Sequence, residues 1–198
     1  MAAGIRLSVS LEPSVSKTHL NDSRTTRIYK VNQSKNYTME VNSHRITREQ
    51  IVQQLEGGQA FLKIEELLEE IDFEDLGKRP AGLPYSFYEQ FFHMRVAQFD
   101  ILDFTRNAYY EPKDWPEEYW PVEPAPDSKE EWEELKASFL KERDEMMNLV
   151  LDESNGLNKP LKHGDGQTLL REALLVLQHN AYHTGQLAII FRLLNKDQ

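Results

Sequence analysis

Apolar residues recur with the spacing of an α-helix in four stretches of the chain, and no stretch shows the two-residue alternation of a strand. The first of these stretches contains the pair Gly57-Gly58, which we expect to break or kink it. Four helices of this length around one core predict an all-α fold, a four-helix bundle. The stretches are residues 47–71, 86–106, 128–151 and a fourth that begins near Asp165 or Thr168 and ends near Leu194.

Three of the predicted helices open with the sequence of a capping box. In this motif a hydroxyl side chain accepts a hydrogen bond from the amide three residues on, and a Glu or Gln side chain there binds back to the cap. The motif therefore places three helix N-termini at hydroxyl residues. The matching sequences are Thr47–Gln50, Ser86–Glu89 and Ser128–Glu131.

A long connection, residues 107–127, lies between the second and third predicted helices. It contains five prolines, two tryptophans and three tyrosines, and a link of this length without secondary structure is uncommon inside a compact domain. It is either an aromatic strap over one end of the bundle or a lid or pocket wall, and both roles can hold together. As a pocket wall, it would bring Trp115, Tyr119 and Trp120 to a ligand.

Charge divides the chain into two parts. The 198 residues carry a formal net charge of −10, but residues 1–38 carry +4 and the remaining 160 residues carry −14. Residues 1–38 are rich in Ser, Thr and Asn without helical periodicity, which predicts a disordered tail. Residues 39–198 then form the domain, with Met39 as an alternative start. A transit peptide is the other interpretation of the tail, which has no secretory signal.

The composition excludes several classes of partner. An acidic domain is unsuited to nucleic acid, because a phosphate backbone is bound by clustered Lys and Arg. No apolar run approaches the roughly 20 residues that a membrane helix needs. The chain has no cysteine, which excludes disulfides, thiolate metal ligands and a cysteine nucleophile. We expect a cytoplasmic protein, since a reducing compartment fits this composition.

The segment QHNAYHTGQ, residues 178–186, places two histidines in the most apolar predicted helix. A turn of ~100° per residue brings His179 and His183 one turn apart on one face, where both rings can reach one metal ion, with Gln186 nearly in line. The spacing alone also occurs in pairs of solvated histidines. The apolar flanks indicate an inward face, where two unpaired imidazoles would be costly and a metal would satisfy both. Asn180 stands where zinc peptidases have Glu, which excludes that class.

A third ligand would come from His93, in the middle of the predicted helix 86–106. The alternative for a lone histidine there is a hydrogen-bonded core residue. Of the remaining histidines, His19 lies in the tail and His44 just before the first helix, so both should be exposed. His163, in the turn before the fourth helix, is a pocket residue or a less favoured ligand.

Two carboxylates lie near the helical face of His93. Asp100, at position +7, and Glu89, at position −4, are candidate general bases. The alternative for Glu89 is a helix cap, which we favour, and the alternative for Asp100 is a charge pair at the surface or between helices.

Residues from about 45 to 195 resemble the DinB-like (damage-inducible, YfiT-related) metalloprotein family. The stretch LPYSFYEQFFHMRVAQFDILDF resembles the family's second helix, whose single metal ligand falls on His93. QHNAYHTGQ resembles its His-x-x-x-His-x-Gly-Gln motif, which places the other two ligands on His179 and His183. WPEEYWP and GQTLLREALLVL match a common subgroup, whereas Gln178 stands where many relatives have an acidic residue. The resemblance implies a four-helix bundle that binds one divalent metal ion and forms a homodimer.

Three neutral nitrogens leave a coordination position open, as in catalytic zinc sites. Imidazole suits Zn, Ni, Cu and Fe alike, and zinc or nickel is the ion that we expect. One hypothesis is metal-dependent hydrolysis of a small molecule, with a bound water as nucleophile and Asp100 as a candidate catalytic base.

The second chemistry is S-transfer from a low-molecular-weight thiol cofactor such as bacillithiol or mycothiol, which some relatives use according to the resemblance. Because the chain has no cysteine, the thiolate would have to come from that cofactor. Candidate cofactor-binding residues for either chemistry are Gln186, Tyr119 and Trp120. The alternative to an enzyme is a non-catalytic metal-binding protein of the stress response, whose bundle serves as an interaction module.

Overall fold

The computed structural model of the protein describes residues 44–195, which are all-helical without strands. Residues 1–43 and 196–198 lie outside the described residues, and with them the predicted tail 1–38, His19 and Met39. Within residues 44–195, no helix has the length and apolar character needed to cross a membrane. The predicted all-α class is confirmed. The elements are a helix over residues 44–56, α2 (Ile64–Glu70), η1 (Phe73–Asp75), α3 (Phe87–Arg106), η2 (Glu117–Tyr119), α4 (Lys129–Leu151) and α5 (Leu169–Leu194).

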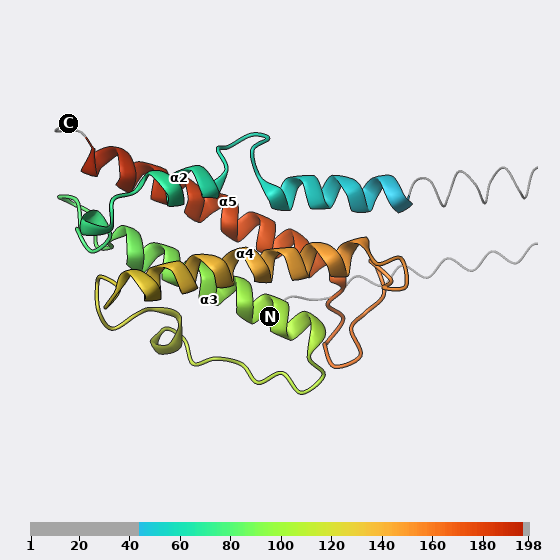
Figure 1. Cartoon of the computed structure of the whole chain (residues 1–198). Helices are drawn as coiled ribbons and strands as arrows, with labels where there is room; N and C mark the ends of the chain where they lie inside the picture. Colours follow the sequence, from blue (N-terminus) through green and yellow to red (C-terminus); the bar gives the residue numbers. More distant parts are fainter. Residues whose placement is uncertain (1–43, 196–198) are drawn as a thin grey trace, which may run out of the picture. The chain divides into compact units, whose positions relative to one another are not determined.

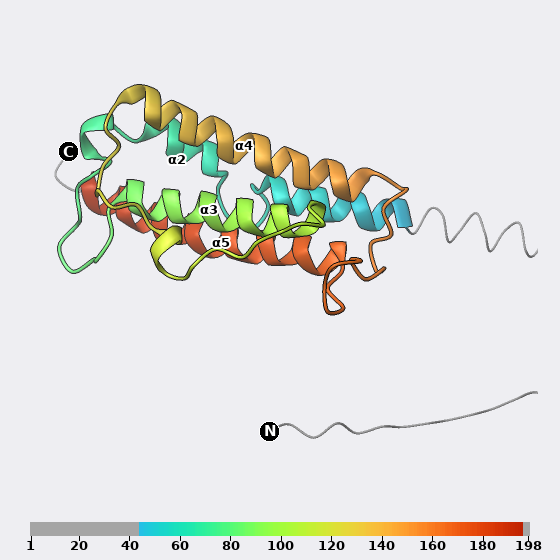
Figure 2. The same cartoon turned by 90° about the horizontal axis from the view of Figure 1, so that it is seen from below.

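Three long helices make up most of the bundle (Figure 1). Helix α3 packs most extensively against α5 and then against α4, and the three helices run side by side in both views (Figures 1 and 2). The helix over residues 44–56 and α2 follow one another along the same side of the bundle and together supply its fourth member. The predicted break is at Gly57 and Gly58, whose φ angles of 76° and 75° favour glycine.

The three predicted capping boxes differ from one another in the structure. Ser86 forms the complete box, since its Oγ accepts from Glu89 N and its own N donates to Glu89 Oε2. Ser128 caps α4 through its side chain, but the box is incomplete. The Glu131 carboxylate accepts from the amide of Asp127, the residue before the cap, instead of from that of Ser128. The prediction for Thr47 is wrong, because Thr47 lies inside the helix over residues 44–56 and cannot cap its start.

The core contains two apolar clusters. One includes Phe91, Trp132 and Phe139 near the α2 end of the bundle, and the other includes Leu102 and Val176 toward the opposite end. On α5, the members of one cluster end at residue 177 and those of the other begin at residue 187. The segment between them contributes to a layer of buried polar side chains. We call this the polar layer, consisting of Gln90, His93, Gln98, Asn180, His183 and Thr184, with the half-buried His179 beside it.

The polar layer is joined across helices by hydrogen bonds. Asn180 Nδ2 donates to Gln98 Oε1 at 2.8 Å, and Gln98 Nε2 donates to the carbonyl oxygen of Phe139 at 2.8 Å. These contacts connect α5, α3 and α4 at one level. Buried polar groups need such partners, since an unmade hydrogen bond costs about 1–3 kcal/mol.

The cap at Ser86 offers a test of how the aromatic-rich connection contributes to stability. Besides capping α3, Ser86 Oγ donates to the carbonyl oxygen of Pro124 at 2.6 Å. We expect Ser86→Ala to lower the free energy of unfolding by about 2–3 kcal/mol, because it removes a cap and a partly buried hydrogen bond. Ser128→Ala, which removes only a cap, should cost about 1 kcal/mol. Urea unfolding of both variants measures the difference, and equal losses would show that the Pro124 contact adds nothing.

Candidate metal centre

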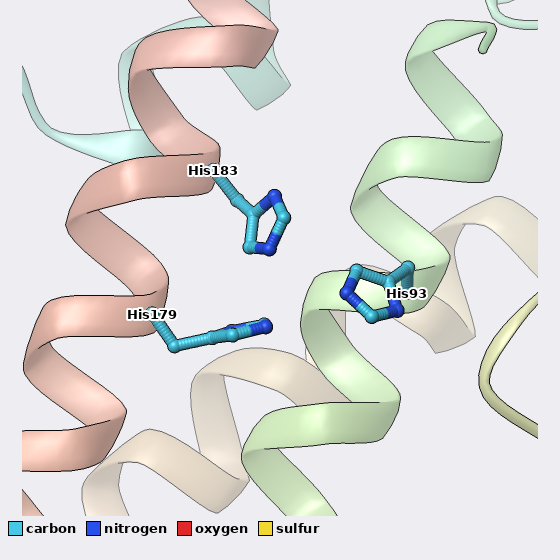
Figure 3. A group of neighbouring side chains, drawn as sticks. All are labelled: His93, His179 and His183. Atoms are coloured by element: carbon cyan, nitrogen blue, oxygen red, sulfur yellow. The ribbon is translucent and has the colours of Figure 1, made fainter. Parts of the chain in front are cut away.

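Three histidines from two helices meet in the bundle. His93 lies on α3, His179 and His183 lie one turn apart on α5, and all three rings point into the same space (Figure 3). The ring centroids are separated by 5.3 Å for His93–His179, 4.9 Å for His93–His183 and 4.2 Å for His179–His183. One nitrogen of each ring lies within 4.8 Å of the others, so the group could hold a metal ion. The structure thus brings together the three residues that the sequence singled out.

The three imidazoles are kept neutral by their surroundings. His93 is 5% exposed and His183 is 8% exposed. Burial, together with the nearby His183, lowers the pKa of His93 to about 4 and that of His179 to about 3. Burial also lowers the pKa of His183. Each ring therefore has an unprotonated nitrogen at neutral pH, which is the form that binds metals.

The ring of His93 is fixed by residues 107–127, which we call the aromatic connection. Its Nδ1–H donates to the carbonyl oxygen of Tyr119 at 3.3 Å, which leaves Nε2 as the unprotonated nitrogen. The indole of Trp120 stacks on the imidazole with centroids 4.2 Å apart and planes 4° apart. Trp120 also stacks on Tyr85 at 4.9 Å. The Trp115 ring meets His93 edge-on, with ring centroids 6.0 Å apart, and this indole is 65% exposed.

The ring of His183 is fixed by two glutamines. Its Nδ1 lies 2.6 Å from Gln186 Oε1, which can accept its proton, and 2.6 Å from the atom placed as Gln90 Nε2. Because a half-turn of an amide exchanges its oxygen and nitrogen, both side chains can accept from one Nδ1–H. Nε2 of His183 is then left free for a ligand. Such second contacts typically set the tautomer and orientation of metal-binding histidines.

His179 differs from the other two histidines. Its Nδ1 is buried without a hydrogen-bond partner of standard geometry among residues 44–195, although the Asn180 side chain lies close enough to oppose the lowering of its pKa. Three neutral imidazoles with convergent nitrogens are a suitable donor set for a borderline metal such as zinc. The residues present therefore fit the metal that the sequence predicts.

The candidate cofactor-binding residues all lie against a histidine. Gln186 contacts His183, whereas Tyr119 and Trp120 contact His93 through a carbonyl oxygen and a ring face. The aromatic connection is thus a wall of the site. Whether these residues also contact a bound cofactor stays a prediction.

The two candidate bases have other partners. Both oxygens of Asp100 accept hydrogen bonds, from Tyr110 Oη at 2.9 Å and from Tyr119 Oη at 2.7 Å. This is neither of the charge pairs expected for Asp100, and it favours an anchoring role over that of a general base. Glu89 is the favoured helix cap. Although burial works against its ionisation, bonds from Arg79 and Ser86 lower its pKa.

The remaining sites named from the sequence lie apart from the three histidines. His163 Nε2 contacts the carbonyl oxygen of Phe104 at 2.6 Å, and this exposed side chain is not in the ligand group. His44 is exposed, as expected, but lies within the first helix instead of before it. Gln178 is exposed on α5 and does not contact His179 through any hydrogen bond of the described residues.

Sequence reasoning missed Gln90 and Tyr110. Gln90 precedes His93 by three residues, so the helical period alone places both on one face and could have identified it. Tyr110 contacts Asp100 only because the aromatic connection folds back along α3. No spacing rule predicts the path of such a segment.

The lowered pKa values predict how the metal-free protein responds to acid. In the unfolded chain a histidine gains its proton near pH 6.5, whereas folded His93 and His179 stay neutral down to about 4 and about 3. Between these pH values the unfolded state binds more protons than the folded state. The contribution of these two histidines to the free energy of unfolding is therefore fully present above about pH 6.5 and is lost as the pH falls toward 4.

Urea unfolding in the presence of a chelator, from pH 7 to pH 4.5, measures this slope. His179→Gln should make the slope shallower, whereas the matched change at the exposed His44, His44→Gln, should not. An unchanged slope in His179→Gln would contradict the prediction.

Comparison with known proteins gives the family. The model of the DinB superfamily matches residues 59–187, a span that begins before α2 and includes all three histidines. Comparisons with the curated proteins and with the solved structures found no match. The matched span covers well over half of the chain and agrees with the helical bundle and with the three-histidine group. The chain therefore belongs to the DinB superfamily.

Proposed function

We propose that the protein is an enzyme that binds one divalent metal ion through His93, His179 and His183. The observation that carries the proposal is the convergence of three neutral imidazoles without a fourth protein ligand. Among residues 44–195, the group contains no other His, Cys, Asp or Glu side chain. Three-ligand sites are typical of catalytic metals, whereas structural zinc sites have four protein ligands.

The chain's own residues have defined roles in this proposal. The imidazoles bind the ion, and Tyr119, Gln90 and Gln186 orient two of them through their second nitrogens. When bound, a divalent metal lowers the pKa of a water from ~15.7 toward ~7, and it similarly favours the thiolate of a thiol. The apolar clusters on either side keep bulk water from the inner faces of the rings.

The substrate that we propose is a small molecule that enters between aromatic side chains. Trp115 and Tyr182 are each 65% exposed, and their rings lie 6.0 Å from His93 and 4.9 Å from His183. Each of these exposed rings thus contacts one of the two most buried ligands. A rim of this kind suits a ligand with apolar surface.

Two reactions are consistent with such a site. Hydrolysis needs only the activated water, whereas S-transfer needs a low-molecular-weight thiol, because the chain has no cysteine. Zinc or nickel remains the proposed ion. A homodimer also remains a proposal, which the exposed apolar side chains Leu174 and Ile189 on α5 support.

The first test of the proposal is metal stoichiometry. Purified protein should contain close to one divalent ion per chain by elemental analysis. His93→Ala, His179→Ala and His183→Ala should each lose most of it, because two ligands bind far more weakly than three. His163→Ala is the matched control, since His163 is exposed and lies outside the group. Full metal content in any of the three variants would remove that histidine from the site.

The second test is whether the ion keeps an exchangeable position. The visible spectrum of the cobalt-substituted protein should shift when azide or a small thiol is added, because the group offers only three protein ligands among residues 44–195. A thiolate-to-cobalt band with bacillithiol would favour S-transfer, whereas a response to azide alone would favour hydrolysis. A spectrum that neither ligand moves would indicate a closed site and a non-catalytic metal-binding protein.

A further inference from the structure

Asp100 joins the aromatic connection to α3 at two points. Its Oδ1 accepts from Tyr110 Oη at 2.9 Å, and its Oδ2 accepts from Tyr119 Oη at 2.7 Å. Both oxygens of one carboxylate are therefore used by residues of the same segment. Hydrogen bonds to an ionised acceptor are roughly twice as strong as those between neutral groups.

The tyrosines remain donors over a wide pH range. Burial, together with the hydrogen bond to Asp100, raises the pKa of Tyr110 to about 12. The phenol is thus protonated at any pH at which the protein would act. Tyr110 can therefore donate to Asp100 throughout that range.

Tyr119 connects Asp100 to the metal centre through its two ends. Its hydroxyl group binds Asp100, while its backbone carbonyl accepts from His93 Nδ1–H at 3.3 Å. Asp100 follows His93 by seven residues, which is two helical turns on nearly the same face of α3. The next residue, Trp120, stacks on the His93 ring. One short segment therefore spans the distance from the carboxylate to the imidazole.

We propose that Asp100 is a positioning residue of the metal site. Through Tyr110 and Tyr119 it places the Tyr119 carbonyl where it fixes the tautomer of His93, with the proton on Nδ1 and Nε2 directed to the ion. The inference rests on the proposed function, because it takes His93 as a ligand. It assigns Asp100 no contact with the substrate.

The physical basis is the choice between two tautomers. A neutral imidazole has its proton on either nitrogen, and an acceptor beside Nδ1 selects the form with a free Nε2. Without the two bonds to Asp100, the aromatic connection has fewer contacts to set the position of its carbonyl group. The ring of His93 would then populate the wrong tautomer, and part of the binding free energy would be spent on correcting it.

Zinc affinity tests the inference directly. Competition with a chromophoric chelator should show weaker zinc binding in Asp100→Ala, by a factor of up to the roughly 10- to 100-fold that follows the loss of a direct partner of a metal ligand. Tyr110→Phe and Tyr119→Phe should each weaken it by a smaller factor. Tyr109→Phe is the matched control, because Tyr109 neighbours Tyr110 but is 90% exposed. Wild-type affinity in all Asp100 and tyrosine variants would overturn the inference.

A second measurement separates positioning from a loss of folding. Long-range ¹H–¹⁵N spectra of the metal-free protein report the tautomer of His93. We expect the Nδ1–H form in the wild type and a mixture in Asp100→Ala, with Asp100→Asn between them because it keeps one acceptor oxygen. A strap that only stabilises the bundle would leave the tautomer unchanged in every folded variant, and this result would also overturn the inference.

The same experiments distinguish the two proposals. A wild-type chain that binds no zinc would contradict the proposed function, while the tautomer spectra would still test the role of Asp100. A wild-type chain that binds zinc with an affinity that no Asp100 variant changes would contradict only the inference.

Discussion

The burial of three imidazoles between α3 and α5 is the constraint around which the rest of the structure is arranged. An imidazole that leaves water must lose its charge and must find partners for its nitrogens. The low pKa values of His93 and His179 show the first effect. The second accounts for side chains whose presence in a bundle core would otherwise be unexplained, since Gln90 and Gln186 both contact His183.

The aromatic connection follows from the direction of the helices. The pairs Tyr88–Glu131 and Arg95–Glu142 show that α3 and α4 run in the same direction, so the segment between them must return along the length of the bundle. On this path residues 107–127 supply His93 with an acceptor and a covering ring, through the Tyr119 carbonyl and the Trp120 indole. Of the two roles suggested for this segment, the structure supports a wall beside His93, and the segment runs along α3 instead of over one end of the bundle. It is attached to α3 through Asp100, and its inner side is the wall of the site.

Local signals in the sequence were sufficient for the helices and for the histidines. Apolar periodicity and the hydroxyl caps located α3, α4 and α5, since both signals depend on residues only three or four apart. The error at Thr47 has the same origin. A hydroxyl residue followed by Gln three residues later is a cap only where a helix starts, and this helix is already formed at residue 44.

Contacts that depend on the path of the chain were not predictable. The partners of Asp100 lie 10 and 19 residues away in the sequence, in a segment without regular periodicity. The sequence therefore offers Asp100 only as a candidate base or a member of a charge pair, whereas both its oxygens accept hydrogen bonds from tyrosines. The positions of the three ligands could be inferred because helical geometry fixes them. The contacts that orient the ligands could not be inferred in the same way. Gln90 and Gln186 are the exceptions, because Gln90 shares a face of α3 with His93 and Gln186 shares a face of α5 with His183.

His93 and His183 lie 90 residues apart in the sequence, on helices that pack against one another. In the proposed metal-bound state they close a long loop of the chain, as a disulfide does in proteins that have cysteine. A coordination link differs from a disulfide in being reversible without a redox reaction. Its contribution to stability rises with the logarithm of the free ion concentration above the dissociation constant. The lifetime of the folded protein would then follow the supply of metal in its compartment.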